Sequence, residues 1–346
     1  MSKSKPTLIV DGNWLLMSRM SVLLNKYGDM DQLCKDLKIL MVKSINIVLK
    51  TFPKIDNVIF VADGGSWRNN LEIPSFLTEE YKGTRIKSDD IDWDTLFASY
   101  EDFIAKLRSN GITTSKELGI EGDDWAWFWS TKLNREGTNC IIWSKDKDLT
   151  QLVKTDNDGC FTVFWNKDNG LVCDDVKEEE IDYLFNFNYS ENENLFKSIE
   201  SKSKAVERIN PKHVVIEKII RGDLGDNIIP ICYKKTKKDS DRKYRISAKD
   251  VDYSIDIHSD ESIKNYVESI LNSKNYAGKI DKPEADIIEH FKYNVKLVEL
   301  AQRNYPAEVL ETMNKYEDYN CSKDINEVEY QIIAEANLIN SVLETI

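Results

Sequence analysis

The sequence lacks an apolar run long enough to span a bilayer, for which about 20 consecutive apolar residues are needed. Residues 1–6 also lack the apolar segment of a secretory signal. The three histidines lie far apart and the six cysteines show no C-x-x-C spacing, which argues against a zinc site and a disulfide framework. We therefore expect reduced, mostly buried thiols and a cytoplasmic setting.

Positive charge is also in deficit. The formal net charge is −13 at pH 7, and an acidic surface taken as a whole repels nucleic-acid phosphates. The distribution of charge matters more than its sum, because carboxylates that converge on metal ions are partly neutralised. The remaining composition, with 41% hydrophobic and 31% charged residues among 346, is that of an ordinary globular protein. This length predicts two domains, or one domain with a helical extension.

Two apolar segments each end in an aspartate followed by glycine. Residues 7–13 and 57–65 predict buried strands, and helical periodicity over residues 31–50 separates them. Strand, helix and strand at this spacing form a parallel βαβ unit, which places Asp11 and Asp63 at one edge of a sheet. The structural alternative for Asp11 is a helix N-cap.

Residues 66–100 interleave aromatic and basic side chains. Such a mixture can stack on bases and bind phosphates, and an exposed helix–loop with ordinary surface charge is the alternative. A helix is predicted from Asp94 to Leu107, so it begins in this segment and extends beyond it. The side chains concerned are Trp67, Arg68, Phe76, Tyr81, Lys82, Arg85 and Lys87.

Two further acidic clusters follow. Residues 121–124 open a predicted helix with three acids, more than capping requires, and the tryptophans of this helix are expected in the core. A predicted strand over residues 140–143 leads to Asp146 and Asp148, which point to the same side of an extended chain. Most D-x-D pairs are solvated loop charges, but ligands gather at the carboxyl ends of parallel strands.

The second half of the chain is more polar. A strand is predicted over residues 161–165, and an insertion or linker with short helices at most over residues 174–212. The next predicted helix runs into residues 222–227, where Asp223 and Asp226 are spaced as neighbours on one helical face.

Residues 234–249 form the most basic segment. It is a candidate phosphate-binding patch, and a disordered solvated loop is a compatible alternative. Residues 259–346 show helical apolar stripes, to which we assign no function beyond packing. The basic side chains are Lys234, Lys235, Lys237, Lys238, Arg242, Lys243, Arg245 and Lys249.

In this order, six motifs resemble the 5′-nuclease family, which comprises flap endonucleases, the 5′ nuclease domain of bacterial DNA polymerase I and phage 5′→3′ exonucleases. The T-even phage ribonuclease H branch is the most similar. The resemblance covers about residues 7–230. The motifs are Ile9-Val10-Asp11-Gly12, Val61-Ala62-Asp63-Gly64, Tyr81-Lys82-Gly83-Thr84-Arg85, Glu121-Gly122-Asp123-Asp124, Ser144-Lys145-Asp146-Lys147-Asp148 and Gly222-Asp223-Leu224-Gly225-Asp226-Asn227.

The resemblance implies a PIN-like α/β nuclease core in residues 1–205, with a helical arch over about residues 66–100. It implies a helical DNA-binding region with a helix–loop–helix-like element in residues 206–346. The implied activity is a structure-selective 5′→3′ exonuclease and flap endonuclease on DNA and RNA–DNA hybrids. It would use two Mg²⁺, for which Mn²⁺ is expected to substitute. We expect a monomer that binds 5′-flap or forked DNA in a host cytoplasm if phage-encoded, near a single-strand-binding protein or sliding clamp.

The resemblance also assigns individual residues. One metal ion would be held by Asp11, Asp63, Glu121, Asp123 and Asp146, and the second by Asp148, Asp223 and Asp226, with Asp124 and Asp146 near both. The catalytic residues would be Lys82, Arg85, Asp146 and Asp148. Nucleic acid would contact Arg68, Tyr81, Lys82, Arg85, Lys87, Lys234, Lys235, Lys237, Lys238, Arg242, Lys243 and Arg245.

One segment departs from the family pattern. Residues 228–235 lack the glycines of a loop that binds the DNA backbone and often potassium, which argues against a K⁺ site and favours Lys and Arg contacts instead. Two other functions stay open. The first is a catalytically silent scaffold for branched DNA, against which the intact acidic set counts. The second is a PIN-type single-strand ribonuclease, a class that is usually shorter and lacks the Gly-Asp-x-x-Asp motif.

Overall fold

The computed structural model describes residues 5–78, 80–84, 88, 90–166, 170–184, 206–235, 243–316 and 324–343. The chain divides into two compact units, each described here by itself. The sheet unit comprises residues 1–65, 88–209 and 307–346, and the helical unit comprises residues 66–87 and 210–306. Within the described part of the chain, no helix combines the length and apolar character needed to cross a membrane.

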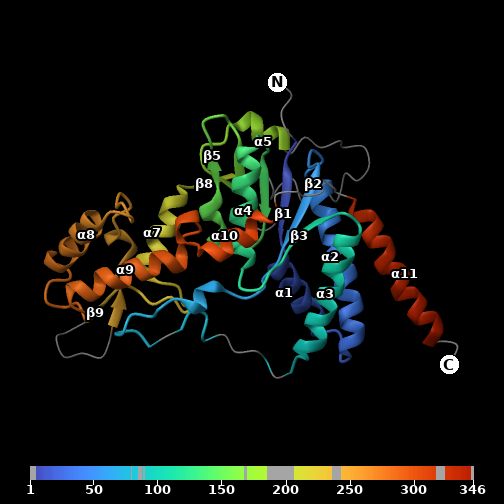
Figure 1. The fold of residues 1–346 in the computed structure, drawn as a ribbon, viewed down its shortest axis with the longest axis horizontal. Coiled ribbons are helices and arrows are strands. Elements are labelled where there is room, and N and C mark those ends of the chain that lie inside the picture. Colours follow the sequence, from blue (N-terminus) through green and yellow to red (C-terminus); the bar gives the residue numbers. More distant parts are fainter. Residues whose placement is uncertain are drawn as a thin grey trace. The chain divides into compact units, whose positions relative to one another are not determined.

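An eight-stranded sheet lies at the centre of the sheet unit (Figure 1). Seven strands follow the order β3-β2-β1-β4-β6-β7-β8, and β5 pairs with β6. The pairs formed by β1 with β2 and β4, by β2 with β3 and by β4 with β6 are parallel, whereas β5 and β7 run antiparallel to β6. The predicted α/β class with a mostly parallel sheet is confirmed. The strands are β1 (Thr7–Asp11), β2 (Asn57–Val61), β3 (Thr113–Ser115), β4 (Cys140–Trp143), β5 (Lys154–Thr155), β6 (Phe161–Asn166), β7 (Gly170–Cys173) and β8 (Val206–Arg208).

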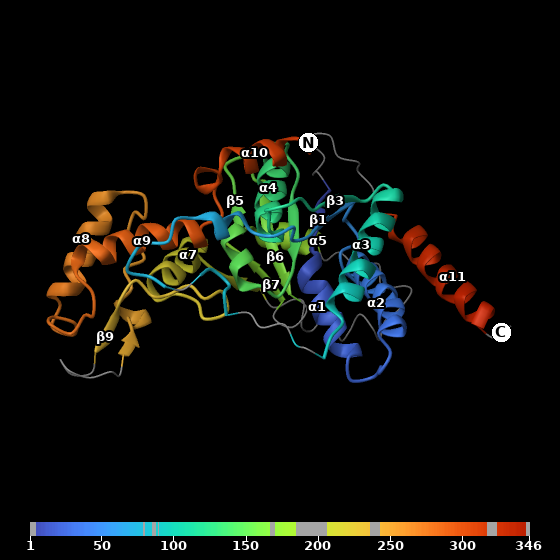
Figure 2. The same ribbon diagram turned by 60° about the horizontal axis from the view of Figure 1, so that its bottom comes forward.

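Helices pack on this sheet because successive strand residues point to opposite faces. Leu8 and Val10 of β1 share one core with side chains of α1, α2, α3, α5 and α11, and α4 contacts β1, β2 and β4. Trp125 and Trp129 of α4 are fully buried, which confirms their expected place in the core, whereas Trp127 is half-buried. The helices of the sheet unit are α1 (Gly12–Leu23), α2 (Met30–Thr51), α3 (Trp93–Ser109), α4 (Gly122–Arg135), α5 (Glu178–Leu184), α10 (Ala307–Asn314) and α11 (Ile325–Leu343); α11 packs on α2 and α3 (Figures 1 and 2).

The helical unit has its own apolar core. Ile219 of α7, Val267 of α8 and Phe291 of α9 are buried together, and Leu71 and Leu77 from the N-terminal segment of the unit pack against them. An antiparallel pair, β9 with β10, belongs to the same unit. The elements are η1 (Trp67–Asn70), α7 (Pro211–Arg221), β9 (Tyr233–Lys235), β10 (Lys243–Arg245), η3 (Ala248–Asp250), α8 (Asp260–Asn272), α9 (Glu284–Val298) and η4 (Gln302–Asn304).

Three features differ from the sequence expectations. Residues 66–87 group with residues 210–306, and residues 307–346 group with the sheet unit, whereas the sequence placed the division at residue 205. Strands β3, β5, β7 and β8 of the sheet were not expected. Between α7 and α8 the chain forms the β9–β10 pair, so the helix–loop–helix-like element implied by the resemblance contains strands here.

Candidate metal and nucleic-acid site

Three neighbouring parallel strands carry the predicted aspartates at their carboxyl ends. β1 lies between β2 and β4, and its last residue, Asp11, is in register with Val61 of β2. Asp63 follows β2 and Asp146 follows β4, so both belong to the same edge of the sheet as Asp11. Open parallel sheets bind their ligands at this edge.

Asp11 is buried and is the N-cap of α1, which confirms the structural alternative considered for it. Its Oδ1 accepts a hydrogen bond from the Trp14 amide at 3.0 Å, and its Oδ2 accepts one from the Ser144 hydroxyl at 2.6 Å. Burial, with a smaller contribution from the charges of Asp63 and Asp146, raises the pKa of Asp11 to about 7 against the lowering effect of these two hydrogen bonds. The fold therefore disfavours a bare negative charge at Asp11.

Asp63 is oriented by a network of hydrogen bonds. The Asn13 amide donates to Asp63 Oδ2 at 2.7 Å, and the Asp63 backbone N–H donates to Asn13 Oδ1 at 3.0 Å. The Gly122 N–H donates to Asp63 Oδ1 at 2.6 Å. Tyr100 of α3 donates to Asn13 Oδ1 at 3.2 Å. Burial, and then the charges of Asp63 and Asp11, raise the pKa of Tyr100 well above its ordinary value, so this hydroxyl stays a donor.

The opening of α4 explains part of the acidic cluster there. Glu121 and Asp124 form a capping box, in which each side chain accepts the backbone N–H of the other. Asp124 is fully buried and accepts the Glu121 N–H at 3.1 Å. Asp123 is half-buried and is not a member of this box. Capping thus accounts for two of the three acids that the sequence singled out.

A chain of hydrogen bonds that starts at Ser144 orders the segment after β4. The Ser144 hydroxyl accepts the Asp146 N–H at 2.9 Å while it donates to Asp11. Asp146 is the N-cap of the short helix η2 (Lys147–Leu152), and its Oδ1 accepts the Asp148 N–H at 2.9 Å. Asp146 is exposed and Asp148 is half-buried. Ser144 therefore couples the ends of β1 and β4.

This edge of the sheet unit fits a hard divalent cation. Such ions prefer oxygen ligands, and the ends of β1, β2 and β4 with the start of α4 supply carboxylates. Asp11 is buried beside two like charges, Asp63 and Asp146, so its charged form calls for a positive partner. Asp11, Asp63 and Asp146 are thus brought together, with Glu121 one residue before the Gly122 amide that binds Asp63.

In the helical unit, Asp223 and Asp226 converge on one cation of the protein. Lys218 Nζ lies 3.2 Å from Asp223 Oδ2 and 2.8 Å from Asp226 Oδ2. The expected shared helical face is wrong, because α7 ends at Arg221 and Gly222 has a φ of +66°. Residues 223–228 instead form a turn closed by a backbone pair between Asp223 and Ile228.

The predicted nucleic-acid residues of the helical unit have different exposures. Arg68 is 3% exposed and its Nε donates to the Leu297 carbonyl of α9 at 3.0 Å, so its place in the structure is a supporting one rather than a surface contact. Tyr81 and Lys82 are half-exposed. Lys234, Lys235, Lys243 and Arg245 lie on the β9–β10 pair. Arg85, Lys87, Lys237, Lys238 and Arg242 lie outside the described residues.

Comparison with known proteins gives the family. The family model described as "5′-3′ exonuclease, N-terminal resolvase-like domain" matches residues 6–182, more than half of the chain. The chain belongs to the 5′-3′ exonuclease family. Two curated 5′-3′ exonucleases of Buchnera aphidicola are similar: that of the subspecies from Acyrthosiphon pisum is 27% identical over 180 residues and that from Schizaphis graminum 28% identical over 178 residues. Each match covers 51% of this chain and spans 58% of the length of the curated relative.

Solved structures show the same fold for this 5′-3′ exonuclease family member. The bacteriophage T5 5′-exonuclease with bound zinc ions has a TM-score of 0.55 and 18% identity, covering 94% of this chain and 99% of that one. The T5 flap endonuclease in a complex with DNA and metal ions has a TM-score of 0.54 and 17% identity, with the same coverage. At these identities the likeness establishes a shared fold, and the predicted fold class and family are confirmed.

The sequence did not identify three polar residues at the carboxyl edge of the parallel sheet. Asn13, Tyr100 and Ser144 each hydrogen-bond to a predicted aspartate or to its partner. Asn13 and Ser144 stand beside the Asp-Gly and Asp-x-Asp motifs, and this adjacency is the signal that could have identified them. Nothing in the sequence indicates Tyr100, which comes from the middle of α3.

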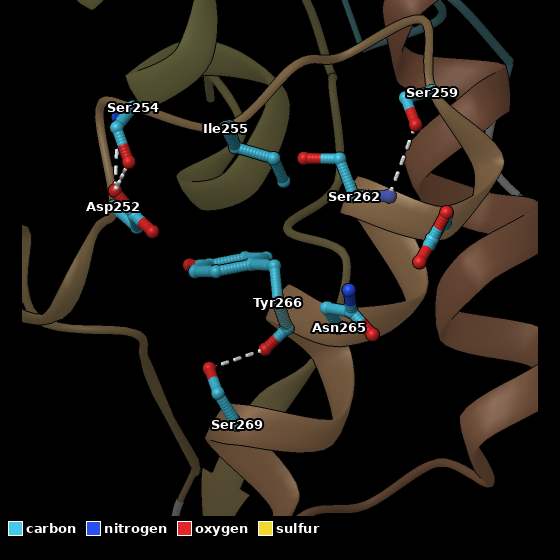
Figure 3. A pocket seen from close by; sticks show the side chains of 9 residues that line it. Asp252, Ser254, Ile255, Ser259, Ser262, Asn265, Tyr266 and Ser269 are labelled. Atoms are coloured by element: carbon cyan, nitrogen blue, oxygen red, sulfur yellow. Dashed lines mark hydrogen bonds between the residues drawn. The ribbon is translucent and has the colours of Figure 1, made fainter.

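The helical unit contains two pockets. One has a volume of about 370 Å³ and is lined by hydroxyl and carboxylate groups, among them Asp252, Ser254 and Tyr266 (Figure 3). The other, of about 650 Å³, lies along the start of α7 and includes Lys212 and Glu299. Among the described residues that line them, neither pocket contains a predicted site residue of the exonuclease family.

Proposed function

We propose that this chain is a magnesium-dependent 5′→3′ exonuclease and flap endonuclease that hydrolyses phosphodiester bonds at the 5′ ends of DNA and RNA–DNA hybrids. The observation that carries the proposal is the meeting of Asp11, Asp63 and Asp146 at the carboxyl edge of the parallel sheet, with Asp11 buried. Membership of the 5′-3′ exonuclease family and the T5 fold support it.

The ligand assignments remain those implied by family resemblance. The resemblance assigns Asp11, Asp63, Glu121, Asp123 and Asp146 to one cation, and Asp148, Asp223 and Asp226 to a second, with Asp124 and Asp146 near both. Asp223 and Asp226 would serve a second cation, for which the Lys218 ammonium between their carboxylates is a stand-in. When bound, two divalent ions lower the pKa of a water molecule and neutralise charge on the phosphate. Mn²⁺ is expected to replace Mg²⁺.

The protein's own residues orient these ligands and bind the substrate. Ser144 and Asn13 hold the carboxylates of Asp11 and Asp63 in place, so their geometry does not have to be assembled for each turnover. Lys82, with Arg85 outside the described residues, would bind the scissile phosphate and stabilise the charge that develops there. The Lys and Arg side chains of β9 and β10 would contact the backbone of flap or forked DNA.

We propose no potassium site. The reason is that residues 228–235 lack the glycines of the family loop that binds potassium. Five free cysteines in the described part of the chain support the proposed cytoplasmic setting. A phage replication role, with a single-strand-binding protein or sliding clamp as neighbour, rests on the resemblance alone.

A gel assay tests this function against the two alternatives. A labelled 5′-flap duplex, an RNA–DNA hybrid and free RNA are each incubated with magnesium or with chelator. We expect cleavage from 5′ ends in the flap and the hybrid, only with magnesium. Cleavage of free RNA alone would indicate a single-strand ribonuclease, and binding without cleavage would indicate a scaffold.

One substitution tests whether this activity depends on the aspartates at the carboxyl edge of the sheet. Asp148→Asn should lower the cleavage rate at least 100-fold and leave flap binding within about threefold, because it removes a predicted cation ligand without changing the shape of the side chain. Asp158→Asn, the same change at an exposed turn residue of the sheet unit, is the matched control and should cleave like the parent. Full activity of the Asp148→Asn protein would refute its role.

A further inference from the structure

Asn294 of α9 is a fully buried amide that uses both of its hydrogens on backbone oxygens. Its Nδ2 lies 2.8 Å from the Ile219 carbonyl and 2.9 Å from the Ile229 carbonyl. Buried amides are paired in folded proteins, but one amide that joins two separate backbone segments fixes their relative position. Asn294 lies in a region to which the sequence suggested no function beyond packing.

The two carbonyls flank the turn that carries the last predicted aspartates. Ile219 lies in the final turn of α7, and Ile229 follows the backbone pair between Asp223 and Ile228. The turn is tight at its entrance, because a Cβ atom on Gly222 would lie 2.3 Å from the Ile228 oxygen. One side chain of α9 therefore holds both ends of the segment between them.

The turn of residues 223–228 also holds the backbone of Lys82. The Lys82 N–H donates to the Asp226 carbonyl at 2.8 Å, and the Asn227 amide donates to the Glu80 carbonyl at 2.8 Å. Lys82 and Asn227 both have a φ of +55°, a left-handed conformation that non-glycine residues rarely adopt. A conformation of this kind persists only where its surroundings impose it.

His290, one helical turn before Asn294, supports the same segment. Its Nδ1 lies 3.2 Å from the Ile231 carbonyl and 2.8 Å from Lys282 Nζ. The ring is fully buried and meets Phe76 edge-on at 6.0 Å between centroids. Two consecutive turns of α9 thus face residues 229–231, and Asn294 is the one that bridges to α7.

We infer that Asn294 is a positioning residue for the reaction: it fixes the turn of Asp223 and Asp226 and, through that turn, Lys82. This inference rests on the proposed function for its effect on turnover, but its structural part stands alone. Asn294 is fully buried, so it would act through this turn and not by touching the substrate. Its loss releases two carbonyls and loosens the contact between Asp226 and Lys82, so chemistry should suffer more than DNA binding.

The test compares Asn294→Ala, which removes both donors, with Asn294→Ser, which keeps one hydroxyl donor in a smaller side chain. The control is Ile263→Ala, a core truncation in α8 of the same unit, where the side chain is 2% exposed. It destabilises the helical unit without removing a donor from the Ile219 or Ile229 carbonyl. If Asn294→Ala does not fold, the measurements are made on Asn294→Ser instead.

Two measurements are made on the full chain. Amide hydrogen exchange should show at least tenfold faster exchange at Lys82 and Ile228 in Asn294→Ala, a smaller increase in Asn294→Ser, and none specific to these amides in Ile263→Ala. Single-turnover cleavage of a 5′-flap duplex should slow at least tenfold in Asn294→Ala, with flap affinity within about threefold of the parent.

Each outcome has a defined meaning. Unchanged exchange at Lys82 in the Asn294 variants, or an equal increase in Ile263→Ala, overturns the inference and leaves Asn294 an ordinary core amide. Faster exchange with unchanged cleavage rates overturns its role in the reaction. If even the parent cleaves no 5′-ended substrate, the proposed function fails. The exchange data then still test whether Asn294 positions Lys82.

Discussion

At the residue scale, Asp11 shows how opposing effects act on one carboxylate. Hydrogen bonds from Ser144 and Trp14 favour its charged form, whereas burial and two neighbouring carboxylates disfavour it. Burial is the largest effect, and the pKa rises from 3.8 to about 7. The same residue caps α1, so a structural role and a predicted role as a metal ligand meet at one side chain.

The raised pKa makes stability depend on pH in a defined direction. Below the unfolded-state pKa of 3.8 both states hold the proton and the cost vanishes. Between about pH 4 and 7 the unfolded chain releases the proton first, so stability falls as pH rises, and above pH 7 the cost is complete. About three pKa units correspond to about 4 kcal/mol. Asp11→Asn should therefore stabilise the metal-free protein by about 2–4 kcal/mol at pH 8 and by little at pH 4.5.

Urea unfolding in chelator across this pH range measures the effect. Asp29→Asn is the matched control, because Asp29 is an exposed N-cap, that of α2, and undergoes the same chemical change. We expect the pH profile of the control to follow that of the parent. Parallel profiles for Asp11→Asn and the parent would mean that the buried carboxylate carries no such cost.

At the element scale, the sequence predicted the parts with long periodic patterns. The helix expected over residues 31–50 is α2 (Met30–Thr51), and the apolar run before Asp63 is β2 (Asn57–Val61). β3 was missed because its three residues, Thr113–Ser115, are polar and too short to show a period, and their place beside β2 depends on tertiary pairing.

The turn of Asp223 and Asp226 was misread for a different reason. A spacing of three suits a helix, but it also suits a turn, and Gly222 at a φ of +66° ends the helix first. The inference that both carboxylates face one point survives, because both lie within reach of Lys218. The spacing of the two aspartates predicted that their carboxylates lie close together, but it did not predict the backbone conformation between them.

The β9–β10 pair carries a prediction of its own. Lys235 and Lys243 are directly opposite in its register, an arrangement of like charges that is unfavourable unless anions compensate it. Lys243 has a partner in Asp281 at 3.3 Å. We expect Lys235→Ala with Arg245→Ala to lower the slope of log affinity against log salt for flap DNA by roughly 2, because each removed contact releases about one counterion.

The control removes the same charge elsewhere in the helical unit. Lys264 on α8 and Lys292 on α9 are exposed and paired with acidic residues. Lys264→Ala with Lys292→Ala should leave the slope unchanged within about half a unit. Binding is measured in chelator, so that cleavage does not interfere. Equal slopes for the two double variants would show that the pair makes no phosphate contact.

At the scale of the whole molecule, the acidic motifs were predictable and their supports were not. Asp11, Asp63 and Asp146 stand out in the sequence because each follows an apolar strand. Asn13 orients Asp63 across fifty positions, and Tyr100 reaches Asn13 from another helix, contacts that only the folded chain defines. Distant carboxylates with a shared sheet edge can thus be inferred from periodicity, whereas the residues that orient them cannot.

Convergent carboxylates predict that the stability of the protein depends on divalent ions. Without cations, Asp63 and Asp146 raise the cost of the charge on buried Asp11, and a bound ion would remove that cost. Magnesium at about 100 times its dissociation constant should stabilise the fold by about 2.7 kcal/mol per site. Calorimetry at pH 7.5 should therefore show a higher Tm with magnesium than with chelator at matched ionic strength.

Asp63→Asn with Asp146→Asn should shrink this shift in Tm. Asp156→Asn with Asp158→Asn, a change of equal charge in the turn before β6, should keep it. A magnesium-independent Tm in the parent would mean that these side chains share no cation.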